Sequence, residues 1–189
     1  MTIEERIAAA ESGLSEKFAL IDKIAYFNQE KVLSAFKEER IALRHFAPST
    51  GYGYGDEGRD ALGRVYARTF GAERAIVSPT LLSGTHSLTV ALFGVLRPGD
   101  KVLCVTGMPY DTLRGVVWGK NNGSLADFGI DFEIVPLNEK GKVDQAAVRQ
   151  KLATSHYQMV YLQRSRGYEL RDSFTVDEIG EACSLVREC

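Results

Sequence analysis

Residues that can hold an anion stand together in the stretch SPTLLSGTHSLTVALFGVL, residues 78–96. Ser83, Gly84 and Thr85 lead there directly into apolar residues with helical spacing. The first turn of a helix presents unpaired N–H groups and the positive end of the helix dipole, so it can seat a phosphate group. An ordinary N-cap without a ligand explains the same residues equally well. His86, the next residue, either points inward or is packed with its hydrogen bonds satisfied.

The stretch TGYGYGDEGRD, residues 50–60, has glycines in the G-x-G-x-x-G spacing of a dinucleotide-binding loop. Such a loop needs a strand before its first glycine and an acidic residue about 20 positions later. Here RHFAPS precedes the glycines and SPTLL stands at the later position, so the spacing does not indicate NAD binding. A flexible loop with positive φ angles is one explanation. We favour a loop that brings Tyr52 and Tyr54 to a ligand.

Two further groups follow apolar runs that are typical of buried strands. Tyr110 comes shortly after KVLCVT, residues 101–106, and its ring can stack on a planar ligand. Gln163, Arg164 and Arg166 come at or after the run MVYLQ. Because parallel strands hold ligands at their carboxyl ends, we expect these side chains at one edge of a sheet. Arginine there can pair with a substrate carboxylate through two hydrogen bonds, although a solvated loop explains the arginines as well.

Apolar runs alternate with helical patterns along the rest of the chain. This order predicts a mostly parallel sheet with helices on both faces, an α/β fold of three layers (α/β/α). The predicted strands are 75–78, 101–106, 132–137 and 159–163, and the predicted helices are 58–70, about 85–96, a segment starting at Pro109, 143–153 and a segment opened by Thr175.

N-terminal helices precede this α/β part. One apolar stripe, with spacings of three, four and seven residues, runs from Leu14 to Phe36. Ser15 is a candidate cap for this helix, and Asn28 is a candidate interruption that would cap a second helix. We therefore divide the chain into an N-terminal helical segment, residues 1–47, and an α/β part, residues 48–189.

The composition is that of an ordinary globular protein. The chain has 189 residues, of which 44% are hydrophobic and 25% charged, and its net charge is −2. We expect no nucleic-acid partner and no membrane partner, because basic patches and long apolar windows are both lacking. The three cysteines have no C-x-x-C spacing and the three histidines no metal-ligand spacing, so we predict reduced thiols, no metal and a cytoplasmic location.

Several long motifs resemble those of the methionine gamma-lyase-like family, whose members are often labelled aluminium resistance proteins. They are STGYGYGDEGRDALGRVYARTFGAERA, SGTHSLTVALFGVLRPGD, GMPYDTL, GSLADFGI and QRSRGYELRDSFTVDEI. The resemblance implies a pyridoxal-phosphate (PLP) enzyme of fold type I, a carbon–sulfur lyase acting on sulfur amino acids, with this chain as the N-terminal part of its large domain. It also implies a homo-oligomer, a dimer or tetramer, with the N-terminal helices at a subunit contact.

The resemblance also implies roles for matched residues. Ser83, Gly84 and Thr85 would hold the cofactor phosphate, Tyr110 would stack on the pyridine ring, and Gln163 would lie beside the cofactor. Substrate contacts would come from Tyr52, Tyr54 and Arg164. The tyrosine-x-arginine pair of cystathionine lyases is missing, since its aligned positions fall near Gly51 and Gly53.

Two groups on which the family's chemistry depends have no counterpart in the matched motifs. They are the aspartate that pairs with the pyridine nitrogen and the lysine that forms the Schiff base. We therefore expect this chain alone to show no lyase turnover and no absorption band of a covalently linked cofactor. The alternatives are an aminotransferase or aldolase on the same fold, and an inert fragment that binds phosphate or forms dimers.

Overall fold

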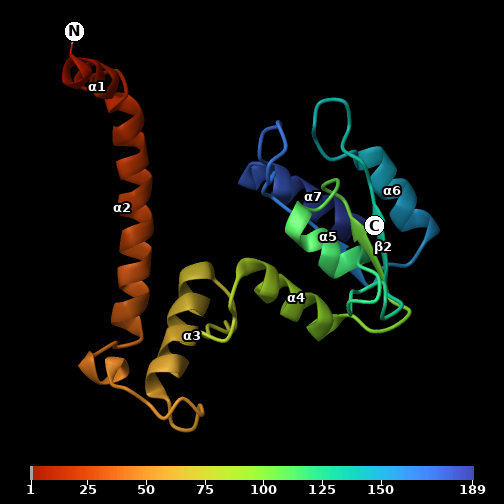
Figure 1. Cartoon of the computed structure of the whole chain (residues 1–189), viewed down its shortest axis with the longest axis horizontal. Coiled ribbons are helices and arrows are strands. Elements are labelled where there is room, and N and C mark those ends of the chain that lie inside the picture. The colour runs from red at the N-terminus through yellow and green to blue at the C-terminus, as the bar shows by residue number, and fades with distance from the viewer. Residues whose placement is uncertain (1) are drawn as a thin grey trace. The chain divides into compact units, whose positions relative to one another are not determined.

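Figure 1 shows the computed structural model of the chain, which describes residues 2–189. The chain forms two compact units, of which the first ends at Leu81 and the second runs from Leu82 to Cys189. The division at residue 47 that the sequence suggests stays a prediction. Each unit is described by itself below.

The first unit is helical. It contains α1 (Ile3–Ser12), α2 (Ser15–Glu38), the 3-10 helix η1 (Leu43–Phe46) and α3 (Glu57–Phe70).

The long helix α2 differs in two details from the sequence-based expectation. Its N-cap is Leu14, and Ser15 is the first helical residue, with its hydroxyl donating to the Ser12 carbonyl at 2.7 Å. The expected interruption at Asn28 is wrong. The Asn28 amide donates to the carbonyl of Ile24 at 2.9 Å, so the side chain bonds along the helix and does not cap a new one.

Helices α2 and α3 pack through small residues and one ionic cluster. Ala35 on α2 and Ala61 and Val65 on α3 are buried. Glu39, just past α2, accepts hydrogen bonds from Arg68 and, at 2.7 Å, from Arg64. These bonds and the two positive charges hold the pKa of Glu39 below its usual range.

The predicted strand at residues 75–78 is wrong. The described structure has no strand in this segment, and Ile76 is 85% exposed. A strand needs a partner for its backbone hydrogen bonds, and no described strand lies in the first unit. Local apolar composition therefore overstated the tendency of this segment to form a strand.

The second unit is built on a parallel sheet of three strands in the order β2-β1-β3. The strands are β1 (Lys101–Cys104), β2 (Asp131–Ile134) and β3 (Met159–Tyr161), all shorter than the predicted runs. Val102 on the central strand pairs with Phe132 on β2 and with Met159 on β3. The predicted parallel α/β arrangement is confirmed for this sheet.

Four helices follow the alternating order that the sequence predicts. They are α4 (Gly84–Val95), α5 (Asp111–Trp118), α6 (Gln145–Thr154) and α7 (Val176–Glu188). Helix α5 begins at Asp111, two residues after the start that we expect at Pro109. Tyr110 has extended backbone (ψ 158°) and is the N-cap of this helix. The start of α7 is confirmed: Thr175 and Glu178 form the expected capping box.

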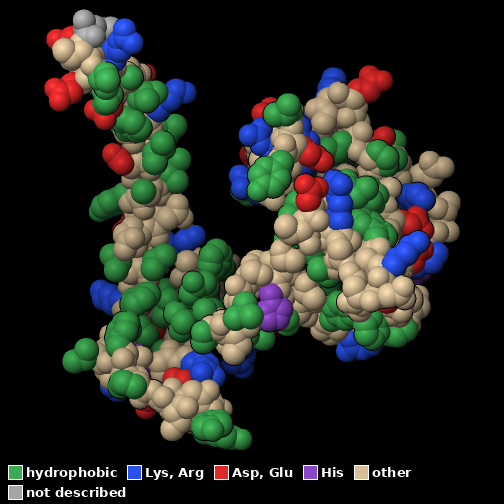
Figure 2. All heavy atoms as spheres, viewed as in Figure 1, with side chains coloured by type: hydrophobic (Ala, Val, Ile, Leu, Met, Phe, Trp, Pro, Cys, Tyr) green, Lys and Arg blue, Asp and Glu red, His purple; other side chains and the backbone are tan. Residues whose placement is uncertain are grey.

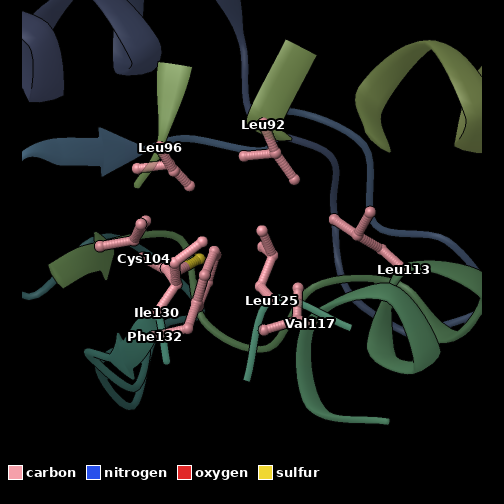
Figure 3. Packing of buried hydrophobic residues seen from close by; sticks show 9 residues of the cluster. Leu92, Leu96, Cys104, Leu113, Val117, Leu125, Ile130 and Phe132 are labelled. Carbon is pink, nitrogen blue, oxygen red and sulfur yellow. The ribbon is translucent and has the colours of Figure 1, made fainter. Parts of the chain in front are cut away.

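Successive residues of β1 face two different hydrophobic clusters. Val102 and Cys104 pack with residues of α4 and α5, including Leu92 and Leu113 (Figure 3). Leu103 and Val105, the residue just past the strand, pack with residues of α6 and α7. Because side chains alternate along a strand, helices cover both faces of the sheet. This double burial explains why β1 is apolar after its first residue, Lys101.

Apolar side chains are exposed along the N-terminal helices of the first unit, as Figure 2 shows in green. On α2, Phe18 is 45% exposed and Ile21 is 59% exposed. Among residues 2–189, no helix combines the length and the apolar character that crossing a membrane requires.

Candidate functional site

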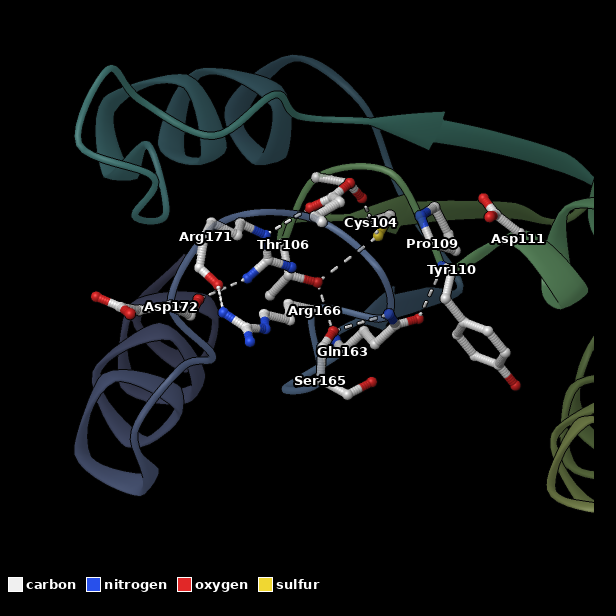
Figure 4. Close-up of polar contacts among 12 residues, drawn as sticks. Cys104, Thr106, Pro109, Tyr110, Asp111, Gln163, Ser165, Arg166, Arg171 and Asp172 are labelled. Carbon is white, nitrogen blue, oxygen red and sulfur yellow. Dashed lines mark hydrogen bonds and ion pairs between the residues drawn. The ribbon is translucent and has the colours of Figure 1, made fainter. Parts of the chain in front are cut away.

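The carboxyl ends of β1 and β3 bring Tyr110 and Gln163 together. The two strands are neighbours and parallel, so the loops that follow them leave the sheet at the same edge. The Tyr110 N–H donates to Oε1 of Gln163 over 3.4 Å. Figure 4 shows the ring of Tyr110 pointing away from the Gln163 side chain. The predicted meeting of these two residues is thus found in the structure.

The N-terminus of α4 is the second part of the site. Ser83 caps the helix through its Oγ, which accepts from the His86 N–H at 3.1 Å. Within residues 2–189, the N–H groups of Gly84 and Thr85 have no acceptor. Gly84 is exposed, and a Cβ built on it meets nothing within 4 Å. Two donors therefore face open space at the positive end of a helix of 12 residues.

Hydroxyl groups connect the start of α4 with the start of α5. Oγ1 of Thr85 lies 2.9 Å from Oγ1 of Thr112 and 3.4 Å from the hydroxyl oxygen of Tyr110. The free amides of α4 and the aromatic ring of Tyr110 thus lie side by side at one edge of the sheet. An anionic group and a planar ring belonging to one ligand fit this arrangement.

Hydrogen bonds among buried and half-buried polar groups, which we call the polar layer, stabilise this edge of the sheet. The N–H of Gln163 donates to Oγ1 of Thr106 at 2.8 Å, and Thr106 is only 2% exposed. The thiol of Cys104 donates to the carbonyl of Gly107 at 3.0 Å. Burial raises the pKa of the Cys104 thiol, so the group stays protonated and is an unreactive part of the core.

Tyr161, the last residue of β3, takes part in the same layer. Burial, with smaller effects of Cys104 and Tyr110, raises its pKa to about 12. The phenol therefore keeps its proton, which it donates to Oε1 of Gln163 over 3.4 Å. Sequence reasoning missed Tyr161, Thr106 and Thr112 as parts of this edge. The available signal was their position at the ends of the apolar runs and at a helix start.

The predicted phosphate group fits the residues at α4. The free amides, the neighbouring hydroxyls and the open space at Gly84 are what a phosphate needs, and no acidic side chain belongs to the first turn of α4. His86 is half-buried, and its Nδ1 accepts from the N–H of Leu82 at 3.2 Å. The packed role for His86 is the one that this hydrogen bond supports.

The remaining predicted site residues are described in their own surroundings. Tyr52 and Tyr54 belong to the first unit and are 82% and 89% exposed. Arg164 is exposed, and its backbone carbonyl accepts from the N–H of Phe174 at 3.3 Å. Arg166 donates to the carbonyl of Arg171 at 2.6 Å and so holds its own loop (Figure 4). Substrate contacts by the tyrosines and Arg164 stay predictions.

The glycine-rich loop has the backbone that its glycines predict. Gly51, Gly53 and Gly55 all have positive φ, at 80°, 83° and 63°. A carboxylate of Asp56 accepts from the Ser49 hydroxyl at 2.9 Å and caps α3. This loop enters a helix without a preceding strand, which agrees with the exclusion of a dinucleotide fold for this segment.

Fold and site together define an α/β protein with a ligand-binding edge at the carboxyl ends of its strands. The chain belongs to the methionine gamma-lyase family, whose sequence profile matches residues 3–189.

Solved structures and a bacterial relative agree with this assignment. The chain is 46% identical to a Listeria innocua protein named "putative cystathionine beta-lyase involved in aluminum resistance", with a TM-score of 0.92 over 100% of this chain and 47% of that one. It is 43% identical to a carbon–sulfur lyase involved in aluminium resistance from Clostridium novyi NT, with a TM-score of 0.89, over 96% of this chain and 44% of that one. Bacillus subtilis (strain 168) YnbB is 46% identical over 171 residues, 89% of this chain and 40% of YnbB. The chain thus spans less than half the length of each relative.

Proposed function

We propose that the chain is the N-terminal part of a PLP-dependent carbon–sulfur lyase that acts on sulfur amino acids in the cytoplasm. Its second unit would then be the first part of a three-layer, fold-type-I large domain. The observation that carries the proposal is the open, uncapped pair of amides at Gly84 and Thr85, next to the ring of Tyr110. Relatives named as lyases of this kind support the reaction class.

Each residue of the edge has a defined task in this proposal. The amides of Gly84 and Thr85 bind the phosphate, and the Thr85 hydroxyl adds a hydrogen bond. Tyr110 holds the pyridine ring by stacking on it. Arg164 pairs with the carboxylate of the amino acid, and this fixes the bond that is to be broken relative to the ring. When bound, PLP supplies an electron sink for the carbanion that forms at Cα of the substrate.

The lysine that would attach the cofactor is not assigned to this chain. None of its lysines lies in a family motif, and the relatives are about twice as long. We therefore propose that the phosphate seat and the stacking ring belong to this chain, and that the attachment lysine belongs to a later part of the whole protein. Incubation of this chain with PLP and a sulfur amino acid should accordingly release no thiol and no sulfide.

The binding test uses pyridoxine 5′-phosphate, because surface lysines would react with the aldehyde of PLP itself. Equilibrium dialysis should show that it binds the chain, that pyridoxine without the phosphate binds far more weakly, and that inorganic phosphate competes. Gly84→Asp should weaken binding roughly tenfold, because it places a carboxylate beside the phosphate. An acidic residue in the first turn is favourable for the helix itself, so folding should be unaffected.

The matched control is Gln145→Asp, which makes the same change of charge in the first turn of α6. It should leave binding unchanged, since the described contacts of Tyr110 include the start of α4 but not the start of α6. Equal binding of pyridoxine and its phosphate, or equal binding by the Gly84→Asp variant and the unchanged chain, would overturn the assignment of the phosphate seat.

A further inference from the structure

The side-chain oxygen of Gln163 is fully used inside the protein, and its amide nitrogen is partly used. Its Oε1 accepts from the N–H of Tyr110 and from the hydroxyl of Tyr161, each over 3.4 Å. Its Nε2 donates to the carbonyl of Ser165 at 3.0 Å. The backbone N–H of the same residue is held by Thr106 at 2.8 Å, in the polar layer that Figure 4 shows. Both acceptor positions of Oε1 are therefore taken, and one N–H of Nε2 is all that the side chain has left for a ligand.

The loop that follows Gln163 presses on Tyr110 from a second direction. At Gly167, which has a φ of 59°, an added Cβ would lie 3.1 Å from the Cβ of Tyr110. A side chain at this position would therefore be crowded against Tyr110, and the glycine lets the backbone of the loop pass close to it. On its other side, the hydroxyl of Tyr110 lies 3.4 Å from Oγ1 of Thr85. Tyr110 thus has hydrogen-bond partners at its amide and near its hydroxyl, and the loop at Gly167 lies close to its Cβ.

From these contacts we infer that Gln163 is a positioning residue, which sets the place of the Tyr110 ring beside the start of α4 and does not itself contact the cofactor or substrate. The inference rests on the proposed function, in that Tyr110 is taken as the stacking residue. It replaces the direct cofactor contact that the family resemblance implies for Gln163. The acceptor oxygen of Gln163 is the atom that matters, because two donors converge on it.

The first readout is the amide of Tyr110 in the full 189-residue chain. Labelling with [15N]tyrosine gives only eight tyrosine signals, and Tyr110→Phe assigns the one of interest. In Gln163→Met the Tyr110 amide should shift and exchange its proton roughly fivefold faster, because it loses its acceptor. Gln163→Glu keeps an acceptor oxygen and should preserve the signal. Gln150→Met, at an exposed position on α6, is the control and should change nothing.

The second readout is the affinity for pyridoxine 5′-phosphate, and the order of the variants decides. A positioning role predicts that Gln163→Met weakens binding several-fold and Gln163→Glu much less, since stacking on a displaced ring is lost. A direct contact with the anionic ligand predicts the reverse order, because the carboxylate of Gln163→Glu would repel it. The reverse order, or an unchanged Tyr110 amide in Gln163→Met, would overturn the inference.

The two proposals fail separately. If the unchanged chain binds no pyridoxine 5′-phosphate, the proposed function fails, while the Tyr110 amide still decides the role of Gln163. The seven other tyrosine signals report whether each variant is folded. If Gln163→Met does not fold, Gln163→Asn serves in its place. It shortens the side chain by one carbon, about 1.5 Å, and should also free the Tyr110 amide; retention of the bond in Gln163→Asn would contradict the inference.

Discussion

Thr175 stabilises the last helix by pairing reciprocally with Glu178. Its hydroxyl accepts from the Glu178 N–H at 3.2 Å, and the Glu178 carboxylate accepts from the Thr175 N–H at 2.9 Å. Thr175→Ala should lower the free energy of unfolding by about 1 kcal/mol, because the backbone N–H of Glu178 in the first turn of α7 loses its acceptor. Urea unfolding followed by circular dichroism measures this. Thr175→Ser keeps the hydroxyl and should cost at most a few tenths of that; an equal loss in both variants would assign the effect to the methyl group.

Single residues of the site differ in how well the sequence predicts them. The helix start at Gly84 and Thr85 could be predicted, because Ser83 is a good N-cap before an apolar helical pattern, but this pattern alone does not separate a ligand site from an ordinary cap. The sequence predicts the sheet edge of Gln163, but it does not predict the hydrogen-bond partners of this side chain. The hydrogen bond from the Tyr110 N–H to the side-chain oxygen of Gln163 joins residues that are 53 positions apart along the chain. No local pattern carries information about a contact of this kind.

At the scale of elements, the buried parallel strands were the most predictable feature. Residues 102–104 are apolar on both faces because helices cover both sides, and such runs are easy to detect. The segment 75–78 has a similar composition but no partner strand in its unit, so no ladder forms. Asn28 failed as a helix break for a related reason: its side chain can bond back to the preceding turn at Ile24.

The stability of the packing between α2 and α3 should depend on pH through Glu39. Its pKa is lowered first by the hydrogen bond from Arg68 and then by that from Arg64. A lowered pKa in the folded state gives stability that is complete above the unfolded-state pKa, about 4.3, and is lost as the pH falls through the folded-state pKa. Melting temperatures should therefore decrease below about pH 4.3 more in the unchanged chain than in Glu39→Gln.

The control for this experiment is Glu30→Gln, at an exposed position on α2 without an ion pair in the described structure. It should keep the steep acid dependence of the unchanged chain. At neutral pH, Glu39→Gln should melt at a lower temperature than Glu30→Gln. If the two variants have the same acid dependence, the ionic cluster at Glu39 does not connect the helices energetically.

At the scale of the whole molecule, the two units differ in how much of their apolar surface they bury. In the second unit, β1 is enclosed from both faces, with Val102 and Leu103 at 0% exposure. In the first, Ala35 is the only buried residue among the described residues of α1 and α2. The apolar stripe that the sequence shows from Leu14 to Phe36 is therefore mostly unpartnered within the first unit. An apolar helix face of this kind is removed from water only when another protein surface packs against it.

We expect a second copy of the chain to supply that cover, as the proposed homo-oligomer requires. Sedimentation equilibrium at micromolar concentration should show a dimer or a larger assembly, and the double variant Phe18→Glu, Ile21→Glu should shift it to the monomer, since it places charges on side chains that are 45% and 59% exposed. The control Asn28→Glu, Gln29→Glu adds the same charge on α2 at polar positions and should stay associated. A chain that is monomeric and melts cooperatively before any substitution would instead favour the alternative of an independent phosphate-binding module, because its exposed helices would then need no partner.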